Sequence, residues 1–127
     1  MPIGETSGEF SYSITSSTFE RQDGCGSQVS INIEGTASGF GQLNGTLTLR
    51  VPNPGATAGP ASYTGASFGD AGEVVGSNGE GCWEQLDGEQ KWRVRGINMN
   101  TDGGVILSDG TLDIGARSFN GTINEWT

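Results

Sequence analysis

The residues best suited to binding chemistry are two tryptophans, Trp83 and Trp92, in the second half of the chain. An indole is a large, rigid, apolar ring with one polar N–H, and such rings suit apolar or sugar ligands. Together with Phe40 and Tyr63, the two tryptophans could line a ligand pocket at the mouth of a β-barrel. Alternatively, the two indoles fill a hydrophobic core as a cross-strand pair, which is a common way of stabilising a sheet.

Charged residues alternate with these tryptophans and form what we call the charge ladder: Glu80, Glu84, Lys91, Arg93 and Arg95. A two-residue turn at Asp87-Gly88 would set Glu84 opposite Lys91 on one face and Trp83 opposite Trp92 on the other. If the ladder faced inward, desolvation would shift its pKa values, and Glu84 and Arg93 could act as catalytic acid–base and anion-binding groups. Because burying five charges costs far more than burying two tryptophans, we expect the ladder outside, where exposed ion pairs contribute about 0.2–1 kcal/mol each.

A second pattern has the spacing of a calcium-binding loop. Asn98, Asn100, Asp102, Gly103 and Asp109 match loop positions 1, 3, 5, 6 and 12. However, two of the oxygen donors are neutral amides, and the flanking residues predict strands rather than helices. A hairpin turn at Asp102-Gly103 is the simpler interpretation.

The chain contains no histidine, which excludes Ser-His-Asp and Cys-His catalysis and histidine-ligated zinc. Cys25 and Cys82 are too few for a structural zinc site, and they could be either one disulfide or two free thiols. We therefore expect no cofactor.

Length and charge restrict the function further. The 127 residues are enough for one domain, 1–127, with a single core. The formal net charge of −9 repels phosphate backbones and anionic membranes, so we expect no nucleic-acid or membrane partner. No apolar run approaches the roughly 18 residues of a membrane span. The first residues lack the basic and apolar regions of a secretory signal, so we expect a cytoplasmic protein, or a secreted one if a signal has been removed.

The elements that must position these residues are predicted by Asn-Gly and Asp-Gly pairs, which begin at Asp23, Asn44, Asn78, Asp87, Asp102, Asp109 and Asn120. Such pairs between alternating apolar residues are the strongest short-range signal for a β-hairpin. We expect tight turns at Asn44, Asp87, Asp102 and Asp109. We expect a longer loop at Asp23, a continuous strand through Asn120, and a surface loop over residues 52–60.

This pattern predicts an all-β fold of about eight to ten short strands. We expect a single antiparallel meander β-barrel, because closure buries the apolar face and removes the edge strands. A β-sandwich is the alternative, since periodicity alone does not distinguish closure from two stacked sheets.

The Gly-rich strand segment Ser38–Leu49 and the hairpin of Gly79–Glu84 with Lys91–Gly96 resemble small calycin-type barrels, and in particular the allene oxide cyclase and dirigent-like group. The resemblance covers most of the chain as an order of hairpins, and no catalytic residue is carried over from it. It implies a barrel that holds an apolar small molecule, sometimes steers its cyclisation without a cofactor, and sometimes assembles into oligomers.

Three functions are consistent with these observations. The first is a binding module for an apolar or aromatic small molecule, contacted chiefly by Trp83 and Trp92. The second is a cofactor-free isomerase or cyclase, in which Glu84 or an arginine such as Arg93 assists proton movement. The third is a structural unit that forms homo-oligomers and has no pocket.

Overall fold

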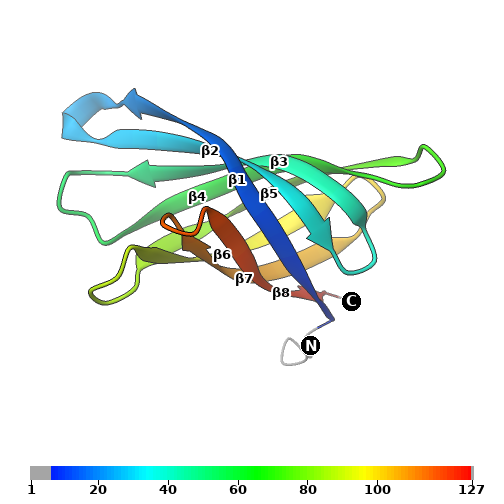
Figure 1. Ribbon diagram of the computed structural model, residues 1–127. Coiled ribbons are helices and arrows are strands. Elements are labelled where there is room, and N and C mark those ends of the chain that lie inside the picture. Colours follow the sequence, from blue (N-terminus) through cyan, green and yellow to red (C-terminus); the bar gives the residue numbers. More distant parts are fainter. Residues whose placement is uncertain (1–6, 127) are drawn as a thin grey trace.

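Eight antiparallel strands follow one another around a closed barrel in the computed structural model, which describes residues 7–126 (Figure 1). They are β1 (Gly8–Arg21), β2 (Ser27–Ala37), β3 (Gly41–Val51), β4 (Ala58–Phe68), β5 (Val74–Gln85), β6 (Lys91–Asn100), β7 (Val105–Asp113) and β8 (Ser118–Glu125). A short 3₁₀ turn, η1 (Asp23–Cys25), connects β1 and β2. Each strand pairs with the next, and β1 closes the barrel against β8 from Gly8–Ile123 to Ser13–Ser118. The expected meander barrel is confirmed, and the sandwich alternative is wrong.

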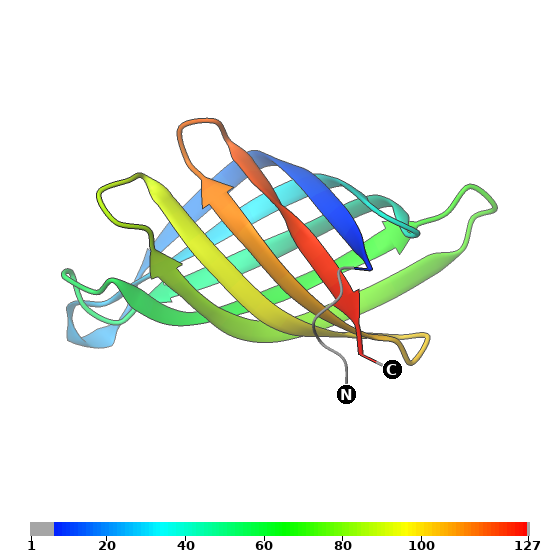
Figure 2. The same cartoon turned by 90° about the horizontal axis from the view of Figure 1, so that it is seen from below.

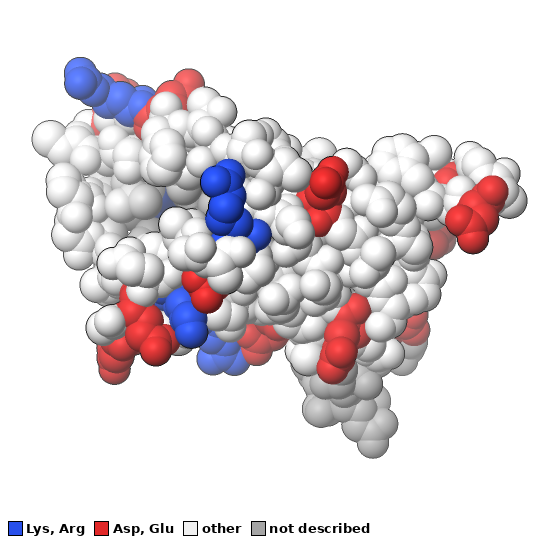
Figure 3. All heavy atoms as spheres, in the orientation of Figure 1, with Lys and Arg blue, Asp and Glu red and all other residues white. Residues whose placement is uncertain are grey.

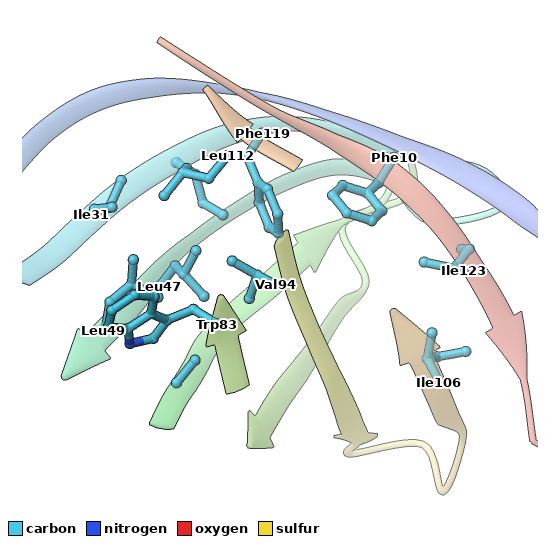
Figure 4. Close-up of a cluster of buried hydrophobic side chains, with 12 residues drawn as sticks. Phe10, Ile31, Leu47, Leu49, Trp83, Val94, Ile106, Leu112, Phe119 and Ile123 are labelled. Atoms are coloured by element: carbon cyan, nitrogen blue, oxygen red, sulfur yellow. The ribbon is translucent and has the colours of Figure 1, made fainter. Parts of the chain in front are cut away.

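The barrel interior is filled by alternate residues of every strand. This core contains Phe10, Ile31, Ile33, Leu47, Leu49, Ala61, Trp83, Val94, Ile106, Leu112, Phe119 and Ile123 (Figure 4). Burying one aliphatic or aromatic side chain of this size stabilises a fold by about 1.5–3 kcal/mol, so closure is driven by this inner face. Among residues 7–126, no helix combines the length and the apolar character that crossing a membrane requires.

The barrel has two chemically different ends, and its strands run obliquely between them (Figure 2). We call one the tryptophan end; it carries the β1–β2, β3–β4, β5–β6 and β7–β8 connections. We call the other the acidic end; it carries the β2–β3, β4–β5 and β6–β7 connections together with the start of β1 and the end of β8. These two ends enclose separate cavities.

The β5–β6 hairpin has a different register from the one we expected. Trp83 lies opposite Val94, and Trp92 lies opposite Gln85, because the connection is two residues longer than a tight Asp-Gly turn. Gly88 has a positive φ of 66°, as a turn requires, but the next ladder bond joins the Leu86 N–H to the Lys91 carbonyl. Since the shift is two residues, every side chain keeps the predicted face.

One Asn-Gly and one Asp-Gly dipeptide lie inside strands, so the turns predicted at these two positions are wrong. Asn44-Gly45 is within β3, and Asp109-Gly110 is within β7. These glycines are needed for space: a Cβ on Gly110 would lie 2.5 Å from the Phe10 ring, and one on Gly45 would lie 2.6 Å from the Tyr63 ring. Removing the Cβ lets a large ring lie flat against the barrel wall.

The other three predictions for Asn-Gly and Asp-Gly pairs are confirmed, whereas the surface loop predicted over residues 52–60 is shorter, because β4 already begins at Ala58. Asp102 and Gly103 form the β6–β7 turn, where Gly103 has a φ of 91° and the Asp102 carboxylate accepts a bond from the Gly104 N–H. Asn120-Gly121 lies within β8, and Asp23-Gly24 lies in the β1–β2 loop.

A bulge in β1 shapes the tryptophan end. The pairing with β2 shifts between Ile14 and Ser16, which adds one residue and changes the phase of the strand. Pairing with β8 stops at Ser13, so the rest of β1 pairs with β2 alone and the hairpin projects beyond the barrel (Figure 1). This projecting hairpin brings Phe19 to the rim.

Candidate ligand-binding site

The tryptophan end contains an open cavity of about 600 Å³. Its lining is almost entirely apolar and comes from six strands and the β7–β8 turn. The lining residues are Ile14, Ser17, Phe19, Val29, Ile31, Leu49, Val51, Trp83, Trp92, Leu112, Ile114, Gly115 and Arg117. Both tryptophans identified from the sequence therefore contact one cavity, although they do not face each other across the hairpin.

Trp83 forms the floor of this cavity. It is 3% exposed, and its indole N–H donates a 2.9 Å hydrogen bond to the main-chain carbonyl of Arg50. The polar atom of the indole is thus satisfied within the protein, and the ring presents only apolar surface to the cavity. Trp92 is half-buried and stands in the wall, between Gln85 of β5 and Leu112 of β7.

The rim of the cavity exposes apolar side chains to solvent. Phe19 is 77% exposed, and Ile114 is 46% exposed. Neither residue was predicted from the sequence to belong to a site. For Phe19 the sequence contained a signal. The apolar residues at the start of β1 have even numbers (Phe10, Tyr12 and Ile14), whereas Phe19 has an odd number, and a one-residue bulge between them produces this change.

Arg117 is the charged residue in the lining of this cavity. It ends the β7–β8 turn with a positive φ of 55°, and its N–H donates a 3.3 Å bond to the Ile114 carbonyl. The turn thus holds an arginine at the edge of an apolar cavity.

The other two predicted ligand contacts, Phe40 and Tyr63, line a second cavity towards the acidic end. This cavity measures about 90 Å³ and shares no lining residue with the first. The central core lies between them, with Trp83 and Leu49 facing the first cavity and Leu47 and Val94 facing the second (Figure 4). The four ligand contacts predicted from the sequence thus divide between two cavities: Trp83 and Trp92 line the first, and Phe40 and Tyr63 line the second.

The charge ladder lies on the outer face of the barrel. Arg93 makes a bidentate pair with Asp109, at 3.0 and 2.6 Å, and also lies 3.8 Å from Glu84. Arg95 lies 3.4 Å from Glu84, and all of these side chains are more than two-fifths exposed. Hydrogen bonding to Arg93 lowers the pKa of Asp109. The inward orientation, which would have allowed Glu84 and Arg93 to act on a bound molecule inside the barrel, is wrong.

The residues with calcium-loop spacing are dispersed. Asn98 and Asn100 line the second cavity, Asp102 caps the β6–β7 turn, and Asp109 binds Arg93 on the outer face. Within residues 7–126, no group of three or more His, Cys, Asp and Glu side chains is arranged to hold a metal ion. Both asparagines lie on the same face of β6 as the inward-facing Val94 and Gly96, because side chains alternate along a strand, and this spacing is the sequence signal for their position inside the barrel.

Cys25 and Cys82 are free thiols, and both are exposed. Cys25 lies at the end of η1, and Cys82 is on the outer face of β5 opposite Arg95. Of the two alternatives that the sequence left open, the structure has the free thiols.

An apolar patch also lies on the outer face near the acidic end. Met99 is 61% exposed, Trp126 is 45% exposed and Ile97 is 43% exposed. Their neighbours on β7 are Val105 and Leu107. Such a patch is a possible contact surface for a second copy of the chain, and homo-oligomer formation stays a prediction.

No protein-family model matches the chain, and comparison with curated proteins and with solved structures finds no match either.

Proposed function

We propose that this barrel binds an apolar or aromatic small molecule in the cavity at the tryptophan end. The observation that carries the proposal is a cavity of about 600 Å³ lined by two indoles and a set of aliphatic side chains. Cavities that hold small molecules usually measure about 300–1,000 Å³ and are mostly apolar with a few polar groups. The exposed Phe19 and Ile114 support the same conclusion, because both line this cavity and extend its apolar surface to the rim.

Arg117 suggests the chemistry of one end of the ligand. It is the charged residue at the edge of this apolar cavity, so it would pair with a carboxylate or another acidic group at the mouth. The proposed ligand is therefore an apolar molecule with one anionic group, whose apolar part is inserted towards Trp83.

The resemblance to the allene oxide cyclase and dirigent-like group is consistent with this proposal, since it implies a barrel that holds an apolar small molecule. A closed antiparallel meander is the architecture that such a resemblance requires. Catalysis by Glu84 and Arg93 is not part of the proposal, because their side chains pair with each other outside the barrel.

The test is a fluorescence titration with two matched dyes. Anilinonaphthalene sulfonate is apolar and anionic, and N-phenyl-1-naphthylamine is its uncharged counterpart. We expect both dyes to bind with quenching of tryptophan emission, and the anionic dye to lose affinity in Arg117→Gln while the neutral dye does not.

Variants of the cavity are compared with one outside it. Phe19→Ser changes an exposed rim position and leaves the core intact. It should lower the affinity for both dyes about fivefold, as expected for the loss of about 1 kcal/mol of apolar contact. Trp92→Ala should weaken them more. Trp126→Ala removes an exposed tryptophan at the opposite end and should bind like the parent protein. Equal binding by Phe19→Ser, Trp92→Ala and Trp126→Ala, with thermal unfolding still cooperative, would overturn the proposal.

A further inference from the structure

The cavity towards the acidic end has a chemistry of its own. Aromatic rings form much of its lining, from Phe10, Tyr12, Tyr63 and Phe119. The amide side chains of Asn98 and Asn100 complete the part nearest the acidic end. Its volume is about 90 Å³, well below the roughly 300–1,000 Å³ of sites for larger ligands, so it suits a small molecule.

Three of these rings form one continuous aromatic wall. The ring centroids of Phe10 and Phe119 are 4.9 Å apart, those of Phe10 and Tyr12 are 5.5 Å apart, and those of Tyr12 and Phe119 are 6.1 Å apart. Phe10 is inclined to both of the other rings, by 61° to Phe119 and by 53° to Tyr12, whereas Tyr12 and Phe119 are nearly parallel at 17°. Rings inclined to one another can each turn part of their electron-rich faces towards a shared centre, and those faces attract a cation within about 6 Å.

The hydroxyl groups in this cavity are neutral, and one of them is unsatisfied. The Tyr63 hydroxyl is buried and makes no hydrogen bond of good geometry with the described residues; the Tyr12 hydroxyl is its nearby polar neighbour and interacts with it only weakly. Burial raises the pKa of both Tyr63 and Tyr12, so both phenols stay protonated at neutral pH and keep an oxygen lone pair available. A buried polar atom without a good hydrogen bond is unfavourable, and a ligand in the cavity could supply the missing interaction.

Two charged residues also border this cavity, but neither charge is placed inside. Glu80 and Arg95 occupy outward positions of β5 and β6, and both are exposed. The Arg95 guanidinium bonds to Glu84 on the outer face. The interior of the cavity therefore holds dipoles and aromatic faces without an ion.

The surrounding field favours a cation. The acidic end carries five described carboxylates and no lysine or arginine: Glu9, Asp70, Glu73, Asp102 and Glu125. All six basic residues of the chain lie on the half nearer the tryptophan end, and the face in Figure 3 shows the same division, with only red acidic groups towards the right. A cavity with one sign of charge around it concentrates ions of the opposite sign.

We infer that this second cavity binds a small organic cation of the alkylammonium class. The aromatic wall contacts the alkylammonium group, Tyr63 and the two asparagines provide oxygen dipoles, and the carboxylates at this end attract the charge. This site is independent of the proposed anionic ligand, because the two cavities have no lining residue in common.

The experiment compares choline with 3,3-dimethylbutan-1-ol, which has the same shape without the charge. Binding is followed by NMR, using the side-chain amides of Asn98 and Asn100. We expect choline to bind at least about tenfold more tightly than the alcohol, as a cation–aromatic contact in a desolvated site predicts. We also expect the affinity for choline to fall several-fold between about 20 and 500 mM NaCl, because salt screens the carboxylates.

Charge variants on exposed loops provide a matched pair that leaves the core intact. The double variant Asp70→Asn with Glu73→Gln, on the β4–β5 loop, should lower the affinity for choline and leave the affinity for the alcohol unchanged. Asp87→Asn with Glu89→Gln, on the β5–β6 loop at the other end, should leave both unchanged. A bound cation should also lower the pKa of the two tyrosines, which absorbance near 295 nm detects.

Three results would overturn the inference: equal affinity for choline and the alcohol, no saturable shift of either asparagine amide, or equal effects of the two loop variants. Displacement of the anionic dye by choline would overturn the independence of the two sites. Failure of the dye experiment alone would leave the choline result unaffected, so the two proposals are tested separately.

Discussion

The indole of Trp83 on β5 reaches across β4 to the main-chain carbonyl of Arg50 on β3, 2.9 Å away. The intervening residue of β4 is Gly59, which leaves room for the ring. The β3–β4 pairing ends at Leu49–Ala61, and the next residue of β4 is Pro60, which has no N–H to continue the ladder. The indole bond therefore ties three strands together at the floor of the proposed ligand cavity.

Gly59→Ala should break this arrangement. A Cβ at this position would lie 2.4 Å from the Arg50 carbonyl oxygen and 2.8 Å from the indole nitrogen, so the bond cannot persist unchanged. We expect a loss of about 1–3 kcal/mol in the free energy of unfolding and a change in tryptophan emission. Denaturant unfolding measures the loss. Gly55→Ala in the neighbouring loop, where the nearest atom is 3.9 Å away, is the control and should be close to neutral.

Gly110→Ala tests whether this glycine lies in a strand under two aromatic rings. Its Cβ would lie 2.5 Å from the Phe10 ring and 2.7 Å from the Phe119 ring, so overpacking should cost about 1–3 kcal/mol in the free energy of unfolding. Combining it with Phe10→Leu should recover part of this loss in a double-mutant cycle. If Asp109-Gly110 formed a turn, the two substitutions would be additive.

The Arg93–Asp109 pair should stabilise the protein near neutral pH and lose this contribution in acid. Because its pKa is lowered in the folded state, the Asp109 contribution is fully present above the unfolded value near 4 and is lost as pH falls through the lower folded value. We expect Asp109→Asn to unfold with a weaker dependence on pH in this range than the parent protein. Denaturation curves at pH 2–5 measure the difference, and identical curves would contradict it.

The two tyrosines should affect stability in alkali. The pKa of each is raised by burial, so their contribution is constant below the unfolded value near 10 and declines as pH rises above it, where only the unfolded chain ionises. We expect no tyrosinate absorbance near pH 10 in the folded protein. Since Tyr12 and Tyr63 are the only tyrosines, a normal titration of even one of them would be visible and would contradict the burial.

Both thiols should react in the native protein. Cys25 and Cys82 are exposed and free, so a thiol reagent should modify two groups per chain without denaturant. Reaction of fewer than two thiols in a reduced sample would show that one side chain is covered, for example by a second copy of the chain.

The periodicity of the sequence was sufficient to predict the face of each side chain in the β5–β6 hairpin. Trp83 faces inward and Arg93 faces outward, as expected, even though the register differs by two residues. A shift of two preserves faces, because side chains alternate with a period of two along a strand. The same periodicity, together with the need to bury the apolar face, was the basis for expecting a closed meander.

The sequence by itself therefore determined the all-β class and the alternation that puts Trp83 and Trp92 on the face opposite the charge ladder. Closure into a barrel and the inward orientation of the tryptophan face were expectations that the tertiary structure decided. Only the tertiary structure decided the roles of the glycines, because a Gly that starts a turn and a Gly that makes room for a ring have the same local pattern. Gly103 is of the first kind and Gly110 of the second, and the difference depends on Phe10, which is distant in the sequence. The division of the predicted contacts into two cavities was decided in the same way, because it depends on how side chains from different strands fill the centre of the barrel.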